Sequence, residues 1–241
     1  MFNLGFTRSS HRHDHLLQTP DTFVRAPLPG MSNAMAIVHA SPALGAKFTQ
    51  YTVEFEAGGS LVPSALQRFV YVLEGELACP GHGSLHPGDF AYFPASSGRI
   101  LSAESASRAA IIEKPYQPLE GFSQPDFFAG RETSIAVQPL MGDPNLTVRS
   151  LIPPGAEFDF AVNVMIYQPG AALTMIEIHV MEHGLLMLQG GGIYRLSDNW
   201  YPVTAGDFIW MAPYCPQWFG ALGSVPAKYL IYKDWNRDPG I

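Results

Sequence analysis

The sequence TAGDFIWMAP, from Thr204 to Pro213, is the second copy of a pattern that first occurs as HPGDFAYFPA at His86–Ala95. Each copy follows a shorter apolar segment that contains a glycine, Gly75 or Gly190. These segments are YVLEGEL at Tyr71–Leu77 and LMLQGGG at Leu186–Gly192. The same two-part pattern therefore occurs once in each half of the chain, which indicates an internal duplication.

Both copies have the local pattern of short β-strands. Phe48–Ala57, FTQYTVEFEA, alternates apolar and polar residues over much of its length, as a half-buried strand does. The chain contains 23 glycines and 21 prolines, a density of helix breakers that long helices do not tolerate. Gly88 and Gly206 are 118 positions apart, which favours two copies of one β-unit over a solenoid of many shorter repeats.

Composition limits the kinds of partner and compartment. Hydrophobic residues make up 47% of the chain, enough to bury a sizeable core. The formal net charge of −7 argues against nucleic acid and anionic membranes as partners. The apolar stretch Phe160–Tyr167 is too short to cross a bilayer. Cys79 and Cys215 lack CxxC neighbours, and no signal peptide is visible, so we predict a cytoplasmic protein without disulfides.

The repeat divides the chain into three predicted parts: a mobile N-terminal arm at 1–20, a first domain at 21–125 and a second domain at 126–241. The arm contains His11, His13 and His15 in a row of alternating positions. A histidine-rich mobile arm without later ligands more often binds metal adventitiously, so we predict no function for it.

A group of side chains suited to metal binding occurs in the second copy alone. Glu177 and His179 are two positions apart, so on a strand they point to the same face, and His183 follows after a bend. Gln217 comes after the second Gly-Asp turn and is a candidate fourth ligand. A carboxylate and two imidazoles inside a β-barrel suit Mn, Fe, Ni or Zn. Glu182 lies on the opposite strand face and is expected to be solvated.

These residues resemble the first cupin motif with its ligand order altered. Glu177 stands where that motif usually has histidine, and His183 where it usually has glutamate. Gln217 stands where a second motif usually supplies histidine. This ligand set, with the strings HGLLMLQGGGIYRLSDNWYPVTAGDFIWMAP and YLIYKDWNRDP, is similar to the (S)-ureidoglycine aminohydrolase family. The resemblance implies an all-β bicupin, that is, two tandem β-jelly-roll (cupin) barrels.

The resemblance also implies roles for residues of the second domain. The implied ligands of Mn(II) are Glu177, His179, His183 and Gln217. Tyr229 and Lys233 match family positions that line the substrate pocket, and Tyr194 is a further candidate for the same wall. Glu177, Tyr229 and Lys233 are the predicted catalytic groups, since a buried lysine can both hold an anion and exchange protons. Which of these groups is the base stays open.

The first domain departs from the metal pattern. Where ligands would fall it has Gln67, Phe69 and Arg99, and no paired histidines occur there. We therefore expect the first domain to be structural, supporting assembly and shaping the pocket mouth.

The implied reaction is release of ammonia from (S)-2-ureidoglycine to give (S)-ureidoglycolate in purine (allantoin) catabolism, with the metal as Lewis acid. One alternative is a cupin dioxygenase or isomerase that uses Fe(II), although a glutamine ligand is unusual in such oxygenases. Another is a non-catalytic cupin that binds a small acid, which Lys233 and Tyr229 beside a full ligand set disfavour. The expected partners are a small-molecule substrate and further copies of the chain in a homo-oligomer.

Overall fold

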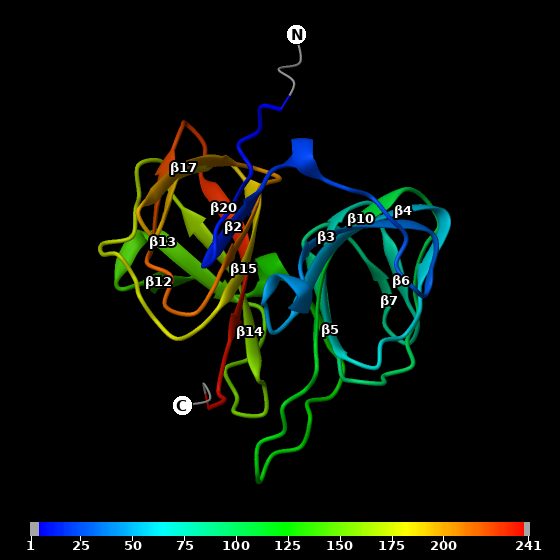
Figure 1. Cartoon of the computed structure of the whole chain (residues 1–241). Coiled ribbons are helices and arrows are strands. Elements are labelled where there is room, and N and C mark those ends of the chain that lie inside the picture. The colour runs from blue at the N-terminus through cyan, green and yellow to red at the C-terminus, as the bar shows by residue number, and fades with distance from the viewer. Residues whose placement is uncertain (1–4, 239–241) are drawn as a thin grey trace. The chain divides into compact units, whose positions relative to one another are not determined.

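The structure is a computed structural model that describes residues 5–238. Within this range it has no α-helix, and its helical turns are three 3-10 segments: η1 (Pro20–Thr22), η2 (Pro42–Leu44) and η3 (Glu132–Ser134). No helix of the described chain is long and apolar enough to cross a membrane. Strands make up the rest of the regular structure and curl around two separate cores (Figure 1). The predicted all-β fold is confirmed.

The N-terminal unit comprises Val24–Ala136 and Leu151–Asp159. Its sheet has the strand order β11-β8-β5-β10-β4-β9-β6-β7, and β3 pairs with β4. The strands are β3 (Met31–Ala40), β4 (Thr49–Leu61), β5 (Gln67–Glu74), β6 (Leu77–Cys79), β7 (Gly83–Leu85), β8 (Asp89–Phe93), β9 (Leu101–Ala103), β10 (Ser107–Lys114) and β11 (Phe128–Arg131).

The C-terminal unit comprises the described residues up to Phe23, Val137–Ser150 and the described residues from Phe160 onward. It has one sheet of order β1-β2-β18-β15-β20-β14-β13-β12 and a second of order β17-β16-β19. Its strands are β1 (Ser10–His11), β2 (His15–Gln18), β12 (Gln138–Leu140), β13 (Asp143–Ser150), β14 (Phe160–Tyr167), β15 (His183–Gln189), β16 (Gly191–Leu196), β17 (Asn199–Thr204), β18 (Phe208–Met211), β19 (Gln217–Leu222) and β20 (Ala227–Asp234).

The repeated Gly-Asp pairs form the same turn in both units. Gly88 and Gly206 have φ values of 84° and 92°, in the left-handed region that glycine adopts at little cost. The carboxylates of Asp89 and Asp207 each accept a hydrogen bond, 2.9 Å long, from the backbone N–H three residues earlier. Each turn therefore closes on itself and starts a buried strand, β8 or β18.

An arginine from outside the repeated pattern neutralises each of these buried aspartates. Arg131 on β11 bonds to Asp89 at 2.7 Å, and Arg8 bonds to both carboxylate oxygens of Asp207 at 2.6 and 2.8 Å. The hydrogen bond to Asp207 raises the pKa of Arg8 above its usual value. The Asp207 side chain has no exposed surface, so the arginine offsets a charge that water does not reach.

The structure differs from the predicted mobile arm at 1–20. Residues 1–4 lie outside the described chain, but His15–Gln18 form β2, which pairs antiparallel with β18 from His15↔Met211 to Phe208↔Gln18. The unit boundary also differs from the predicted division after residue 125. Strand β11 pairs with β8, so residues up to Ala136 belong to the N-terminal unit. Long-range strand pairing, which local patterns do not encode, causes both differences.

Replacing Arg8 tests how firmly the N-terminal segment is held. Arg8→Ala leaves the buried Asp207 carboxylate without its bidentate partner, and we expect a loss of about 2 kcal/mol in the free energy of unfolding. Denaturant unfolding measures this loss. The matched control is Arg25→Ala, which removes an exposed ion pair with Glu54 and costs less than about 1 kcal/mol. Equal losses in the two variants would contradict the anchoring role of Arg8.

Candidate metal centre

The C-terminal unit encloses a cavity of about 370 Å³ lined by residues from both of its sheets. Apolar walls come from residues such as Met165, Leu173 and Ile231. The polar side chains that line the cavity gather on a few strands: Ser150 on β13, Asn163 and Tyr167 on β14, Glu177 and His179 before β15, His183 on β15, Tyr194 on β16, Gln217 on β19, and Tyr229 and Lys233 on β20. The cavity thus brings together every residue that the sequence assigned to the site.

Two imidazoles and an amide converge in this cavity. The Nε2 atoms of His179 and His183 are 3.2 Å apart, and Nε2 of Gln217 lies 2.9 Å from Nε2 of His179. Nδ1 of His183 donates a hydrogen bond to the carbonyl oxygen of Tyr232 at 3.2 Å. Because that bond takes the ring proton, Nε2 of the neutral His183 ring presents a lone pair to His179.

Backbone hydrogen bonds position this group. The N–H of Glu177 donates to the carbonyl of Gln217 at 2.9 Å, and the N–H of Gln217 donates back at 3.0 Å. The N–H of Tyr214 bonds to the carbonyl of His179 at 2.8 Å. The predicted strand through Glu177 and His179 is absent. Glu177 instead forms an isolated bridge, and β15 begins at His183.

Glu177 stands somewhat apart from the imidazoles. Its side chain lines the same cavity, but among the described residues it forms no cluster with His179 and His183 in which all ligand atoms lie within 4.8 Å of one another. The carboxylate is therefore beside the histidine and glutamine group and is not in contact with every member of it.

The donor set fits a divalent metal ion. Two imidazole nitrogens bound side by side to one ion are about 3 Å apart, which matches the spacing of His179 and His183. Oε1 of Gln217 accepts from the Tyr194 hydroxyl at 3.3 Å. That hydroxyl can also accept, so the amide is paired in either orientation and can present its oxygen to the imidazoles. Nδ1 of His179 is buried without a partner among the described residues. Imidazole, amide and carboxylate donors suit Mn, Fe, Ni or Zn.

Lysine and tyrosine side chains complete the polar wall. The hydroxyls of Tyr167 and Tyr229 are 2.9 Å apart, and burial raises the pKa of Tyr229 well above its usual value. The ammonium of Lys233 lies 4.4 Å from the ring centre of Trp235 and makes no ion pair with the described residues. Burial lowers the pKa of Lys233, and attraction to Glu177 opposes that effect. Lys233 is thus a cation without an anionic partner in contact.

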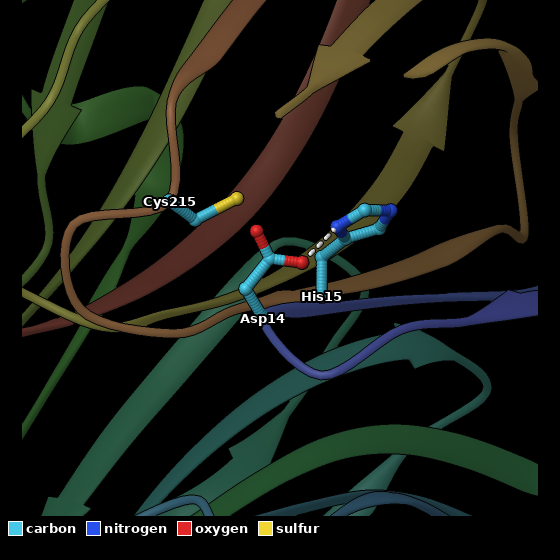
Figure 2. Close-up of side chains that lie close together, drawn as sticks. All are labelled: Asp14, His15 and Cys215. Carbon is cyan, nitrogen blue, oxygen red and sulfur yellow. Dashed lines mark hydrogen bonds and ion pairs between the residues drawn. The ribbon is translucent and has the colours of Figure 1, made fainter. Parts of the chain in front are cut away.

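Figure 2 shows a second group of side chains that lie close together, Asp14, His15 and Cys215. Their ligand atoms all lie within 4.8 Å of one another. Asp14 accepts from Nδ1 of His15 at 2.8 Å and from the Ser197 hydroxyl, and Nε2 of His15 accepts from the Tyr201 hydroxyl at 2.9 Å. Burial acts to raise the pKa of Asp14, but these hydrogen bonds outweigh it and lower that pKa. Both ring nitrogens are already used, so we interpret this cluster as the anchor of β2.

Glu182 corrects the sequence interpretation. It was expected to be solvated, but only 1% of it is exposed, and its carboxylate accepts a hydrogen bond of 3.2 Å from Nε1 of Trp210. Trp210 lies on β18, a strand whose neighbours cannot be inferred from the residues around Glu182. The carboxylate packs against this long-range partner instead of facing water.

The N-terminal unit has an ion pair at the positions that correspond to His183 and Lys233. Arg68 on β5 pairs with Phe93 of β8 as His183 on β15 pairs with Met211 of β18, so Arg68 corresponds to His183. Arg68 also lies opposite Glu113 of β10 and bonds to it at 2.7 Å, while the sequence had placed the ligand positions at Gln67, Phe69 and Arg99. Arg68 and Glu113 therefore neutralise each other at the positions that correspond to His183 and Lys233.

Comparison with known proteins identifies the chain. A probable (S)-ureidoglycine aminohydrolase of Oryza sativa subsp. japonica is 41% identical over 98% of this chain and 77% of that protein. An (S)-ureidoglycine aminohydrolase of Arabidopsis thaliana is 38% identical over 98% of this chain and 80% of that protein. The chain belongs to the (S)-ureidoglycine aminohydrolase family. No protein-family model matches it.

Solved structures agree with the cupin fold of this (S)-ureidoglycine aminohydrolase family member. The crystal structure of the Escherichia coli protein YlbA superposes with a TM-score of 0.86 at 29% identity, covering 98% of this chain and 97% of that one. The Mn(II)-containing oxalate decarboxylase of Bacillus subtilis gives a TM-score of 0.69 at 10% identity, covering 96% of this chain and 80% of that one. The second likeness shows the fold alone.

The sequence interpretation did not single out Asn163 as a site residue. A signal was present, since Asn163 is the one strongly polar residue within the apolar stretch FAVNVMIY of β14. A polar side chain in a buried strand needs a partner, and that requirement points toward a cavity or a ligand.

The buried imidazole of His183 predicts a pH dependence of stability in protein stripped of metal by a chelator. Burial, with the nearby His179, lowers the pKa of His183 to about 3. The unfolded chain takes up this proton near pH 6.5 and the folded chain does not, so the free energy of unfolding falls as pH falls from about 6.5 toward 3. His183→Gln removes this contribution, and we expect it to flatten the dependence by about 1 kcal/mol per pH unit between pH 6 and 5. Urea unfolding at several pH values measures the slope, and an unchanged slope contradicts the assignment.

Proposed function

We propose that this protein is an (S)-ureidoglycine aminohydrolase that uses Mn(II) to release ammonia from (S)-2-ureidoglycine and form (S)-ureidoglycolate, a step of purine catabolism. The observation that carries the proposal is the convergence of His179, His183 and Gln217 beside the cation Lys233 in one cavity. The names of the plant relatives supply the substrate.

Residues of this cavity match the chemical groups of the substrate. We propose that His179, His183, Gln217 and Glu177 hold the metal ion, which when bound supplies Lewis acidity beside the reacting carbon. Lys233 binds the substrate carboxylate, since a partly desolvated ammonium without an ion-pair partner attracts an anion strongly.

Proton transfer falls to the chain's own groups. Water supplies the oxygen of the new C–O bond and loses a proton, and the amine gains a proton as the C–N bond breaks and ammonia leaves. Glu177 is the single carboxylate among the residues that line the cavity, and we propose that it carries this proton. The Tyr229 hydroxyl, held at 2.9 Å from that of Tyr167, is a fixed donor that orients the substrate.

Ammonia release tests the reaction. Purified protein loaded with Mn(II) is expected to release ammonia from freshly prepared ureidoglycine well above the spontaneous background and to form the (S) product, as followed by an ammonia assay and chiral chromatography. Release at the background rate contradicts the proposed function. Bound iron together with oxygen uptake would instead support a cupin dioxygenase.

Removing one imidazole tests the metal assignment. We expect His179→Ala to lose most of its bound Mn(II) and its activity, because the site keeps one imidazole of two. Elemental analysis of the dialysed protein measures the loss, and circular dichroism checks the fold. His86→Ala, at an exposed histidine of the N-terminal unit, is the matched control and should keep both metal and activity. Unchanged metal content in His179→Ala means that the ligands are misassigned.

Lys233 is tested through substrate binding. Lys233→Met keeps the length of the side chain and removes its charge, and we expect kcat/KM to fall about 100-fold, mainly through KM. Bound metal should stay near the wild-type amount, because the lysine is not a ligand. Lys228→Met, on the same strand and outside the cavity, should leave kcat/KM unchanged. Equal kinetics in the two variants contradicts a role for Lys233 in binding the carboxylate.

A further inference from the structure

Asn163 is a buried amide whose oxygen lacks a partner. Only 8% of the residue is exposed, its side chain lines the cavity, and its Oδ1 accepts no hydrogen bond from any residue that the structure describes. A buried acceptor left unpaired costs on the order of 1–3 kcal/mol, so proteins rarely retain one without a purpose. The cavity that it lines is the place where a ligand could supply the missing donor.

Strand register places Asn163 near Lys233. On the paired strands β14 and β20, Asn163 lies opposite Ile231, and Ala161 lies opposite Lys233. Asn163 and Lys233 are therefore diagonal neighbours, and both line the cavity. Lys233 in turn lies opposite His183 on β15. A line of polar groups thus runs across the sheet from the imidazole to the ammonium and on to the amide.

In the N-terminal unit, the positions that correspond to His183, Lys233 and Asn163 hold side chains that interact with one another. Strand register relates Tyr51 on β4 to Asn163 on β14. Tyr51 lies opposite Ile111, two positions before Glu113, and Asn163 lies opposite Ile231, two positions before Lys233. Tyr51 interacts with both Glu113 and Arg68, which themselves form an ion pair. Groups at these three positions therefore lie within reach of one another, and in the N-terminal unit two of them, Arg68 and Glu113, form an ion pair.

We propose that Asn163 recognises the ureido group of the substrate, with Oδ1 accepting a hydrogen bond from a ureido N–H while Lys233 holds the carboxylate. This assignment rests on the proposed function. The substrate carries three polar groups on one carbon, and neighbouring residues on one sheet face can hold two of them at once.

Hydrogen-bond chemistry selects the ureido group. An unpaired carbonyl oxygen needs a donor, which a carboxylate cannot provide, whereas Lys233 offers donors only. The substrate amine has donors but no acceptor suited to the N–H groups of the amide. A ureido group has both, so the carboxamide of Asn163 can pair with it edge to edge, oxygen to N–H and N–H to carbonyl. Two such bonds fix the orientation of the substrate as well as its position.

Two stable analogues separate this role from general binding. Ureidoacetate has the carboxylate and the ureido group, and N-acetylglycine replaces the terminal ureido NH₂ with a methyl group. Using isothermal titration calorimetry on the Mn(II)-loaded protein, we expect wild type to bind ureidoacetate about tenfold more tightly than N-acetylglycine. In Asn163→Leu this preference should fall below about twofold. The matched control Asn145→Leu makes the same change at an exposed asparagine of β13 outside the cavity, and it should keep the tenfold preference.

The melting temperature of Asn163→Leu separates a role in binding from a structural role. A structural role predicts a lower melting temperature, and a role in binding does not. Asn163→Leu replaces an unpaired buried amide with an apolar group of similar size, so its melting temperature should equal or exceed that of wild type. A clearly lower melting temperature, or a variant that keeps the tenfold preference, overturns the proposal. Wild type that releases ammonia without preferring ureidoacetate overturns this proposal alone, whereas wild type that neither releases ammonia nor binds ureidoacetate overturns the proposed function as well.

Discussion

The candidate site depends on the pair of backbone hydrogen bonds between Glu177 and Gln217. The chain from residue 174 to residue 182 contains no strand, and this bridge fixes it to β19. The bridge sets the Glu177 backbone beside that of Gln217, and the bond from Tyr214 to the His179 carbonyl adds a second attachment. Because backbone bonds make these attachments, the side chains remain free to point into the cavity.

The site also draws its side chains from both sheets of the C-terminal unit. Gln217 lies on β19 in the three-stranded sheet, whereas His183 and Lys233 lie on neighbouring strands of the eight-stranded sheet. The tyrosines follow the same division, with Tyr194 on β16 and Tyr229 on β20. A donor set drawn from both sheets is held rigidly, since neither sheet can shift without disturbing the other's contacts.

Part of this arrangement could be predicted from local sequence. The Gly-Asp turns were visible because glycine at positive φ and a carboxylate that bonds three residues back are local devices. The ligand types at Glu177, His179 and His183 were visible for a similar reason, since they lie within seven positions. Contacts that join distant segments were not visible. Arg8 reaches Asp207 and Trp210 reaches Glu182 only after the strands have paired, and no period in the sequence specifies those partners.

The two units differ in whether the polar side chains at corresponding positions pair with each other or line a cavity. At the position of His183 and Lys233, the N-terminal unit has Arg68 and Glu113, whose charges compensate each other at 2.7 Å. In the C-terminal unit, Oδ1 of Asn163 and Nδ1 of His179 are buried without a partner among the described residues, as are the amide atoms of Gln50 in the N-terminal unit. Asn163 and His179 differ from Gln50 because they line one cavity, beside a lysine that makes no ion pair with the described residues. Unpaired buried groups reduce stability. A ligand can pair the two groups at the cavity, so its binding can return the stability that they cost.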